Sequence, residues 1–200
     1  MTNMLQHLNS EMAAAVEQAR RSLVQIQNGR GAGAGTIWQA DGLIVTNAHV
    51  VRQGGISVTL PDGRSLPARL LAHDPQRDLA ALAVAANNLP TITLGDARRL
   101  QPGQWVLALG HPWGVKGAVS AGAVIAVGVP PELPGARGEF IQVGLPLRPG
   151  HSGGPLIDGQ GRLIGINTMI SGPEVGLAVP VHVVKRFLRE RLGSPDIVFI

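Results

Sequence analysis

The 200-residue sequence contains no cysteine and no tyrosine, and aromatic residues make up only 3% of it. Without cysteine the chain can form neither disulfides nor thiolate metal sites, and it has no cysteine nucleophile. Apolar runs stay well below the ~20 residues that a membrane helix needs, so we expect no membrane anchor. The first residues lack the basic start and apolar stretch of a secretory signal, which leaves the cytoplasm as the compartment expected from the sequence as given.

Lysine is also scarce, with Lys116 and Lys185 as its two positions. The pI of about 10.9 therefore reflects the missing tyrosine and cysteine more than a large excess of positive charge, because the net charge is only +4. This balance does not require a phosphate-binding surface, and we expect no nucleic-acid partner. The six histidines show no paired spacing typical of metal ligands, so we expect neither a metal nor a cofactor.

Glycine and proline are abundant, with 27 and 15 residues, and they cut the chain into short segments. These segments alternate apolar and polar residues or form short apolar runs, as in residues 56–60 and 79–84. About twelve such strands without helices between them favour an all-β fold, built as barrels or as a sandwich. A change of character over residues 98–103 divides the strands into two similar groups, which favours two small barrels.

Both ends of the chain show helical spacing instead. Ser10 is a candidate N-cap for a helix that runs into a strand near Leu23, and a second helix lies between Pro180 and Gly193. We expect the apolar segment 196–200 to add a strand to a sheet edge. The predicted segments are a helix with a lead-in strand over 1–28, a first barrel over 29–100, a second barrel over 101–180, a helix over 181–193 and an apolar tail over 194–200.

Three polar residues stand where chemistry is expected. His49 follows an apolar strand, Asp78 opens a buried strand, and Ser152 lies in a glycine-rich turn between strands. The Gly-x-Ser-x-Gly spacing around Ser152 also occurs in α/β-hydrolases, but there the serine precedes a helix and the acid and histidine follow it. Here a strand follows Ser152, and the order His, Asp, Ser is that of the chymotrypsin architecture.

These residue types fit nucleophilic catalysis. A serine hydroxyl needs a neighbouring base, a neutral imidazole is the base suited to neutral pH, and a carboxylate behind it fixes the tautomer. The glycines around Ser152 let the backbone N–H groups of Gly150 and Ser152 turn toward one point, where they would form an oxyanion hole.

The chain resembles the protease domain of the HtrA (high-temperature-requirement) family of trypsin-like serine proteases. The matching segments are residues 41–51, 62–64, 74–82, 103–110, 150–156, 165–168 and the start of the last helix at 179–180. The resemblance implies two six-stranded β-barrels, with His49 and Asp78 from the first barrel and Ser152 from the second. The implied activity is that of a serine endopeptidase acting on unfolded or extended polypeptides through an acyl-enzyme.

The resemblance also implies a specificity pocket formed by Leu147, Thr168, Met169 and Ile170. Two aliphatic residues and a methionine would make a shallow apolar slot. We therefore expect cleavage after medium aliphatic residues such as valine, leucine, isoleucine or alanine.

The chain departs from the family pattern in several places. His151 stands where the family commonly has asparagine, and Val143–Pro146 replaces its usual Thr-Asp-Ala, so the support of the serine loop differs. We expect no PDZ domain in these residues, and the N-terminus lacks the aromatic residues through which many relatives form trimers. A non-catalytic peptide-binding module with the same fold is the alternative function.

Overall fold

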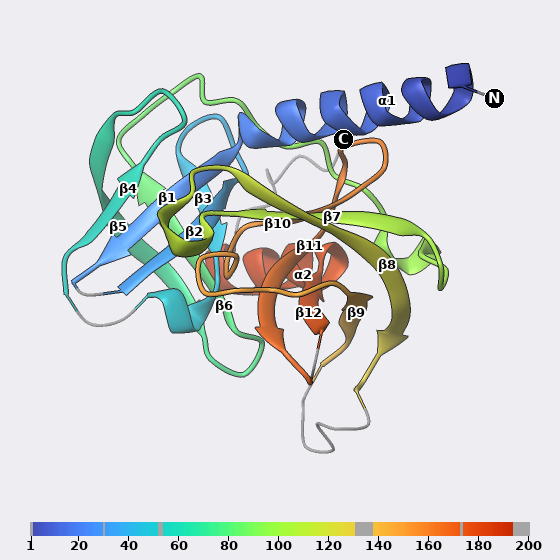
Figure 1. Cartoon of the computed structure of the whole chain (residues 1–200). Helices are drawn as coiled ribbons and strands as arrows, with labels where there is room; N and C mark the ends of the chain where they lie inside the picture. The colour runs from blue at the N-terminus through green and yellow to red at the C-terminus, as the bar shows by residue number, and fades with distance from the viewer. Residues whose placement is uncertain (1, 30, 52–53, 131–137, 173, 194–200) are drawn as a thin grey trace.

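The computed structural model of the protein describes residues 2–29, 31–51, 54–130, 138–172 and 174–193. Its strands form two closed barrels of six antiparallel strands each (Figure 1), so the predicted all-β double barrel is confirmed. A helix lies at each end of the described chain, and short 3-10 turns at Ala48–Val50, Ala97–Arg99 and Pro112–Gly114 connect some of the strands.

The first barrel closes in the order β1-β2-β3-β6-β5-β4. Its strands are β1 (Leu23–Asn28), β2 (Gly31–Ile37), β3 (Leu43–Thr46), β4 (Ile56–Thr59), β5 (Ser65–Asp74) and β6 (Leu79–Val84). Ile26, Ile44 and Leu82 are fully buried inside it. Because these large aliphatic side chains come from different strands, burying them together holds the barrel closed.

The second barrel closes in the order β10-β11-β12-β9-β8-β7. Its strands are β7 (Trp105–Gly110), β8 (Ala118–Gly128), β9 (Phe140–Gly144), β10 (Pro155–Asp158), β11 (Leu163–Ile170) and β12 (Val175–Pro180). Helix α2 (Val181–Leu192) follows Pro180 and ends at Gly193, which adopts the left-handed conformation typical of a helix C-terminus. Its Phe187 is fully buried and extends the core of this barrel.

Two details of the N-terminal region differ from the prediction. Helix α1 spans Thr2–Arg20 and therefore includes Ser10, whose hydroxyl donates to the Gln6 carbonyl at 2.9 Å instead of capping a helix start. A serine inside a helix can make this bond, so its presence does not mark a boundary. The lead-in strand is β1, which pairs with β2 and β4 and belongs to the first barrel. The predicted strand over 196–200 lies outside the described residues.

The C-terminal half of helix α1 lies along the second barrel, whereas its N-terminal half projects from the body of the molecule (Figure 1). Ala15 and Ala19 are buried, whereas Met4, Leu5 and Leu8 are exposed. Neither helix in the described part of the chain is long and apolar enough to cross a bilayer.

Candidate active site

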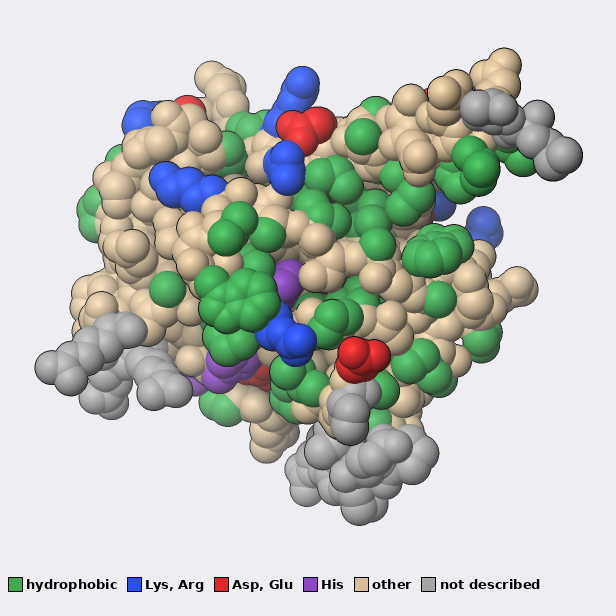
Figure 2. All heavy atoms as spheres, viewed as in Figure 1, with side chains coloured by type: hydrophobic (Ala, Val, Ile, Leu, Met, Phe, Trp, Pro, Cys, Tyr) green, Lys and Arg blue, Asp and Glu red, His purple; other side chains and the backbone are tan. Residues whose placement is uncertain are grey.

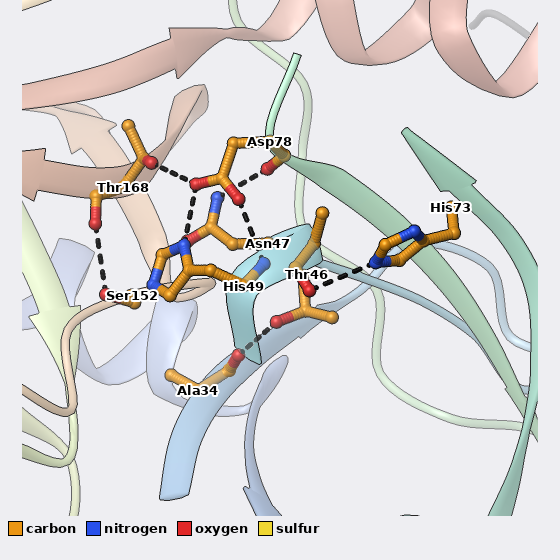
Figure 3. A network of polar contacts seen from close by, with 9 residues as sticks. Ala34, Thr46, Asn47, His49, His73, Asp78, Ser152 and Thr168 are labelled. Carbon is orange, nitrogen blue, oxygen red and sulfur yellow. Dashed lines mark hydrogen bonds and ion pairs between the residues drawn. The ribbon is translucent and has the colours of Figure 1, made fainter. Parts of the chain in front are cut away.

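His49 lies in the 3-10 turn directly after β3, which brings it to the junction between the barrels (Figure 3). Its ring Nδ1 is 2.8 Å from Asp78 Oδ2, and its backbone N–H donates to Asp78 Oδ1 at 3.0 Å. The carboxylate thus fixes both the ring and the backbone of one residue. Since Nδ1 faces the carboxylate, the other ring nitrogen remains for a reacting group.

Asp78 immediately precedes β6 and holds a backbone conformation that is unusual for a residue with a side chain, with φ of +53°. The Asn47 amide donates to its carbonyl at 2.9 Å, which helps to hold it there. Backbone strain of this kind persists only when surrounding contacts enforce it, and it concentrates at functional sites. The sequence analysis did not predict this role for Asn47, which precedes His49 by two residues.

The hydrogen bonds around Asp78 decide its charge. Burial is the largest single effect and raises the pKa of Asp78, but bonds from the His49 ring, the Thr168 hydroxyl and the His49 backbone together lower that pKa below its ordinary value. Hydrogen bonds to a carboxylate stabilise its charged form. Asp78 therefore stays ionised at neutral pH and can stabilise a positive charge on the imidazole.

Ser152 lies on the loop between β9 and β10, and this loop is bound to both barrels. The Ser152 carbonyl accepts from the Ala34 N–H of β2 at 2.8 Å, and the Gly153 N–H donates to the Asn167 carbonyl of β11 at 2.9 Å. Gly153 is packed so closely that an added Cβ would lie 2.0 Å from the Ala34 carbonyl oxygen. Only glycine fits there, which explains part of the glycine-rich sequence around Ser152.

Thr168 of β11 connects Ser152 with Asp78. The Ser152 hydroxyl donates to the Thr168 carbonyl at 3.0 Å, and the Thr168 hydroxyl donates to Asp78 Oδ2. Among the described residues no hydrogen bond joins His49 directly to Ser152, although Figure 3 shows the serine beside the imidazole. In this structure the serine hydroxyl therefore binds the main chain and has to turn to reach the imidazole.

Gly150 lies in a tight turn before Ser152. The His151 N–H donates to the Arg148 carbonyl at 2.9 Å, and Gly150 has φ of +106° after Pro149, as in a type II turn. The Gly150 carbonyl accepts from the His111 N–H at 2.8 Å. Within the described chain, the N–H groups of Gly150 and Ser152 have no protein acceptor, so both remain available to a bound molecule.

A cleft of about 670 Å³ contains these groups. His49 and Ser152 line it together with Leu147, Met169 and Ile170. Leu147 is buried, whereas Met169 and Ile170 are 37% and 48% exposed and present an apolar surface to it. Figure 2 shows histidine surface bordered by hydrophobic side chains on one face of the molecule.

Thr168 also lines the cleft, and its side chain is almost entirely buried. It is 4% exposed, and its hydroxyl faces Asp78. The pairing of β11 with β12 shifts register between Asn167 and Met169, and such a bulge redirects the side chain of the extra residue. Thr168 thus lies at the cleft, where its hydroxyl is directed to Asp78, and its part in substrate binding stays a prediction.

The matching family model is described as a trypsin-like peptidase domain and covers residues 33–166. The chain belongs to the trypsin-like peptidases. Among solved structures, the HtrA-type protease AlgW with tripeptide superposes with a TM-score of 0.85 at 35% identity, over 90% of this chain and 62% of that chain. AlgW with decapeptide superposes with a TM-score of 0.83 at 30% identity, over 91% and 67%. The resemblance of this trypsin-like peptidase to the HtrA type is confirmed.

Curated relatives of this trypsin-like peptidase are named "Probable periplasmic serine endoprotease DegP-like". The protein from Halomonas elongata is 44% identical over 162 residues, and the protein from Chlamydia muridarum is 38% identical over 171 residues. These matches cover 77% and 82% of this chain but 34% of each relative, so the chain spans about a third of their length.

The names of these relatives contradict the cytoplasmic expectation, because they point to the periplasm. That expectation rested only on the composition of the first residues. These residues form α1, and part of this helix packs against the barrel, so they report on the fold and not on the compartment.

Proposed function

We propose that this chain is a serine endopeptidase that hydrolyses extended polypeptides through an acyl-enzyme. The observation that carries the proposal is the hydrogen-bonded pair of His49 and Asp78 in one cleft with Ser152. His49 acts as general base and then general acid, Asp78 orients and stabilises its imidazolium form, and Ser152 is the nucleophile. A metal or cofactor has no part in this scheme.

The first step is reorientation of the serine hydroxyl. In the resting arrangement this hydroxyl donates to the Thr168 carbonyl. A substrate N–H that binds the same carbonyl would displace it, and the hydroxyl would then turn to the free nitrogen of His49. Substrate binding and activation of the nucleophile are thereby coupled through one main-chain acceptor.

Attack of Ser152 Oγ on the scissile carbonyl moves the hydroxyl proton to His49 and places a negative charge on the carbonyl oxygen. The N–H groups of Gly150 and Ser152, which have no acceptor in the described chain, bind that oxyanion. In comparable sites one such donor contributes about 3–4 kcal/mol to transition-state stabilisation. His49 then protonates the leaving amine, and water hydrolyses the acyl-enzyme by the same steps in reverse.

The apolar part of the cleft selects the residue before the scissile bond. Leu147 packs on Gly176, where an added Cβ would lie 2.9 Å from Leu147 Cγ, so its position is fixed. With Met169 and Ile170 it offers an apolar surface, which favours valine, leucine, isoleucine or alanine over charged residues.

Digestion of unfolded casein with mapping of the cleaved bonds tests both parts of this proposal. We expect cleavage after medium aliphatic residues by the unaltered chain and none by the Ser152→Ala variant. Cleavage after lysine or arginine would overturn the specificity, and cleavage by Ser152→Ala would overturn the mechanism. Tight binding of casein without cleavage would favour the peptide-binding module, which the bond from Ser152 to Thr168 in the resting structure also fits.

The relatives also suggest where the enzyme acts. Because they are named periplasmic endoproteases, we place this chain in the periplasm. Osmotic-shock fractionation of the source cells should release it with the periplasmic proteins, whereas recovery with the cytoplasmic fraction would contradict this placement.

A further inference from the structure

The residue before the nucleophile is a buried histidine whose ring binds its own loop. His151 is 2% exposed, and its ring Nδ1 lies 3.1 Å from the Arg148 nitrogen and 3.2 Å from the Arg148 oxygen. The Arg148 N–H donates to Nδ1 when that nitrogen carries no proton. The ring lies next to Ser152 and contacts the serine loop, yet the mechanism proposed above gives it no role.

Arg148 begins the turn that contains Gly150. The His151 backbone N–H closes this turn on the Arg148 carbonyl at 2.9 Å, and the His151 ring binds the Arg148 N–H from the side. One residue thus holds both backbone polar groups of Arg148. From the other side, the His111 N–H holds the Gly150 carbonyl at 2.8 Å, so the Gly150 peptide lies between two fixed points.

The surroundings of the His151 ring favour its neutral form. Its Nε2 is buried and has no hydrogen-bond partner within the described residues. Burial is the main cause that lowers the pKa of His151. The hydrogen bond to the Arg148 backbone raises that pKa and the charge of Arg148 lowers it, and the net direction is downward. His151 in turn acts on His111, which follows β7. The pKa of His111 is lowered mainly by burial and further by the charges of Lys116 and His151, and its Nδ1 accepts from the Gly117 N–H at 3.2 Å.

We propose that the neutral imidazole of His151 is a positioning residue, which holds the turn at Arg148 so that the Gly150 N–H faces the substrate oxygen. Protonation of Nδ1 replaces its acceptor role toward the Arg148 N–H by a donor role toward the Arg148 carbonyl 3.2 Å away, which shifts the turn and withdraws the Gly150 donor. The inference deepens the proposed function, since it rests on the role of Gly150 in the oxyanion hole. It predicts that protonation of His151 adds one protonation step to the loss of activity in acid.

Nuclear magnetic resonance tests the contact without any activity. Labelling with carbonyl-13C leucine and 15N arginine selects the amides of Leu-Arg pairs, which occur in this sequence at Leu147-Arg148 and Leu188-Arg189. The Arg148 signal should shift as the pH falls below 6.5, the Arg189 signal should not, and His151→Asn should abolish the shift, since asparagine accepts a hydrogen bond at all pH values. An Arg148 signal that does not titrate, or that titrates equally in His151→Asn, would overturn the proposal.

Peptide hydrolysis tests the consequence. At neutral pH, His151→Leu should lower kcat on the order of 10²-fold with little change in KM, as expected for a lost oxyanion donor, whereas His151→Asn should keep most of the activity. The acid limb of log kcat/KM against pH should have a slope near two in the unaltered chain and near one in His151→Asn. Equal slopes, or an asparagine variant as impaired as the leucine variant, would overturn the proposal.

The two measurements separate this inference from the proposed function. His151→Asn carries the test on its own if the leucine variant does not fold, because it keeps a buried acceptor. A chain that hydrolyses nothing while its Arg148 signal titrates with His151 would overturn the peptidase and leave the contact established.

Discussion

The two barrels contribute unequal halves of the site. In the first barrel, His49 and Asp78 already bind each other, and Asn47 holds the strained backbone of Asp78. In the second barrel, Ser152 binds the Thr168 carbonyl, and its loop is held through closely packed glycines and a buried histidine. The proposed base is therefore assembled before substrate arrives, whereas the proposed nucleophile still has to turn. In the proposed mechanism, activation is a property of the second barrel.

The largest effect should come from removing the preassembled base. We expect His49→Ala to lower kcat on the order of 10⁶-fold without unfolding the chain, because the ring is 46% exposed and its loss leaves no large cavity. The matched control is His73→Ala, since this histidine is exposed and its ring lies 3.2 Å from the Ala48 carbonyl oxygen, away from Ser152 and Asp78 (Figure 3). Assays on a short chromogenic peptide should leave His73→Ala nearly unchanged, and equal losses would contradict the assignment.

The second largest effect should come from a change at the junction of the barrels, and it should lower stability. Gly153→Ala places a Cβ 2.0 Å from the Ala34 carbonyl oxygen at φ of +86°, so the two barrels have to separate or the loop has to move. We expect a loss of roughly 3 kcal/mol or more in the free energy of unfolding, measured in urea at unchanged slope. Gly159→Ala is the control, because no atom of the described residues lies within 4 Å of its added Cβ. Similar midpoints for both variants would show that the junction tolerates movement.

The contact that links the two halves should have a smaller effect. Thr168→Val removes the hydroxyl that donates to Asp78 and keeps both the shape and the main-chain carbonyl. Loss of a hydrogen bond to a charged group should lower kcat about tenfold, and Thr168→Ser should restore most of it. Steady-state kinetics that place the valine and serine variants at the same kcat would contradict a role for this hydroxyl.

The smallest expected effect is on the pH dependence of stability, to which the two barrels contribute in different pH ranges. Burial lowers the pKa of His111 and His151, so the unfolded chain binds more protons, and stability should decline as the pH falls from about 6.5 toward their folded values. The pKa of Asp78 is lowered too, so its contribution should persist above 3.8 and disappear as the pH falls through its folded value. Urea unfolding at several pH values should show two separate declines, and His151→Asn should reduce the first alone. A single decline below pH 4 would contradict this division.

Much of this architecture follows from the sequence, because strand patterns and turn residues act locally. Leu79–Val84 reads as a buried strand and forms one, and Gly193 ends a helix as expected. The predicted start of α1 at Ser10 was wrong, because a serine can form a hydrogen bond within a helix as well as cap one. The position of Thr168 could not be predicted, since the register shift in β11 that turns its side chain toward Asp78 depends on pairing with a distant strand.

Trp113 shows the same limit. Its large apolar side chain would suit a buried position, yet it is 76% exposed, and its backbone has φ of +52°. Its position depends on how residues 110–112 pack against the serine loop, where the Gly150 carbonyl binds the His111 N–H. Contacts between segments that lie far apart in the chain decide such details, and the local pattern does not contain them.

The most direct test of the account is intact-mass spectrometry after reaction with a fluorophosphonate, which modifies an activated serine. We expect one adduct per chain, located on Ser152 and absent from Ser152→Ala and His49→Ala. Labelling that is faster in the presence of an aliphatic peptide product would also support activation through the Thr168 carbonyl. An unmodified chain under all conditions, or an adduct that persists in His49→Ala, would contradict a nucleophile activated across the two barrels.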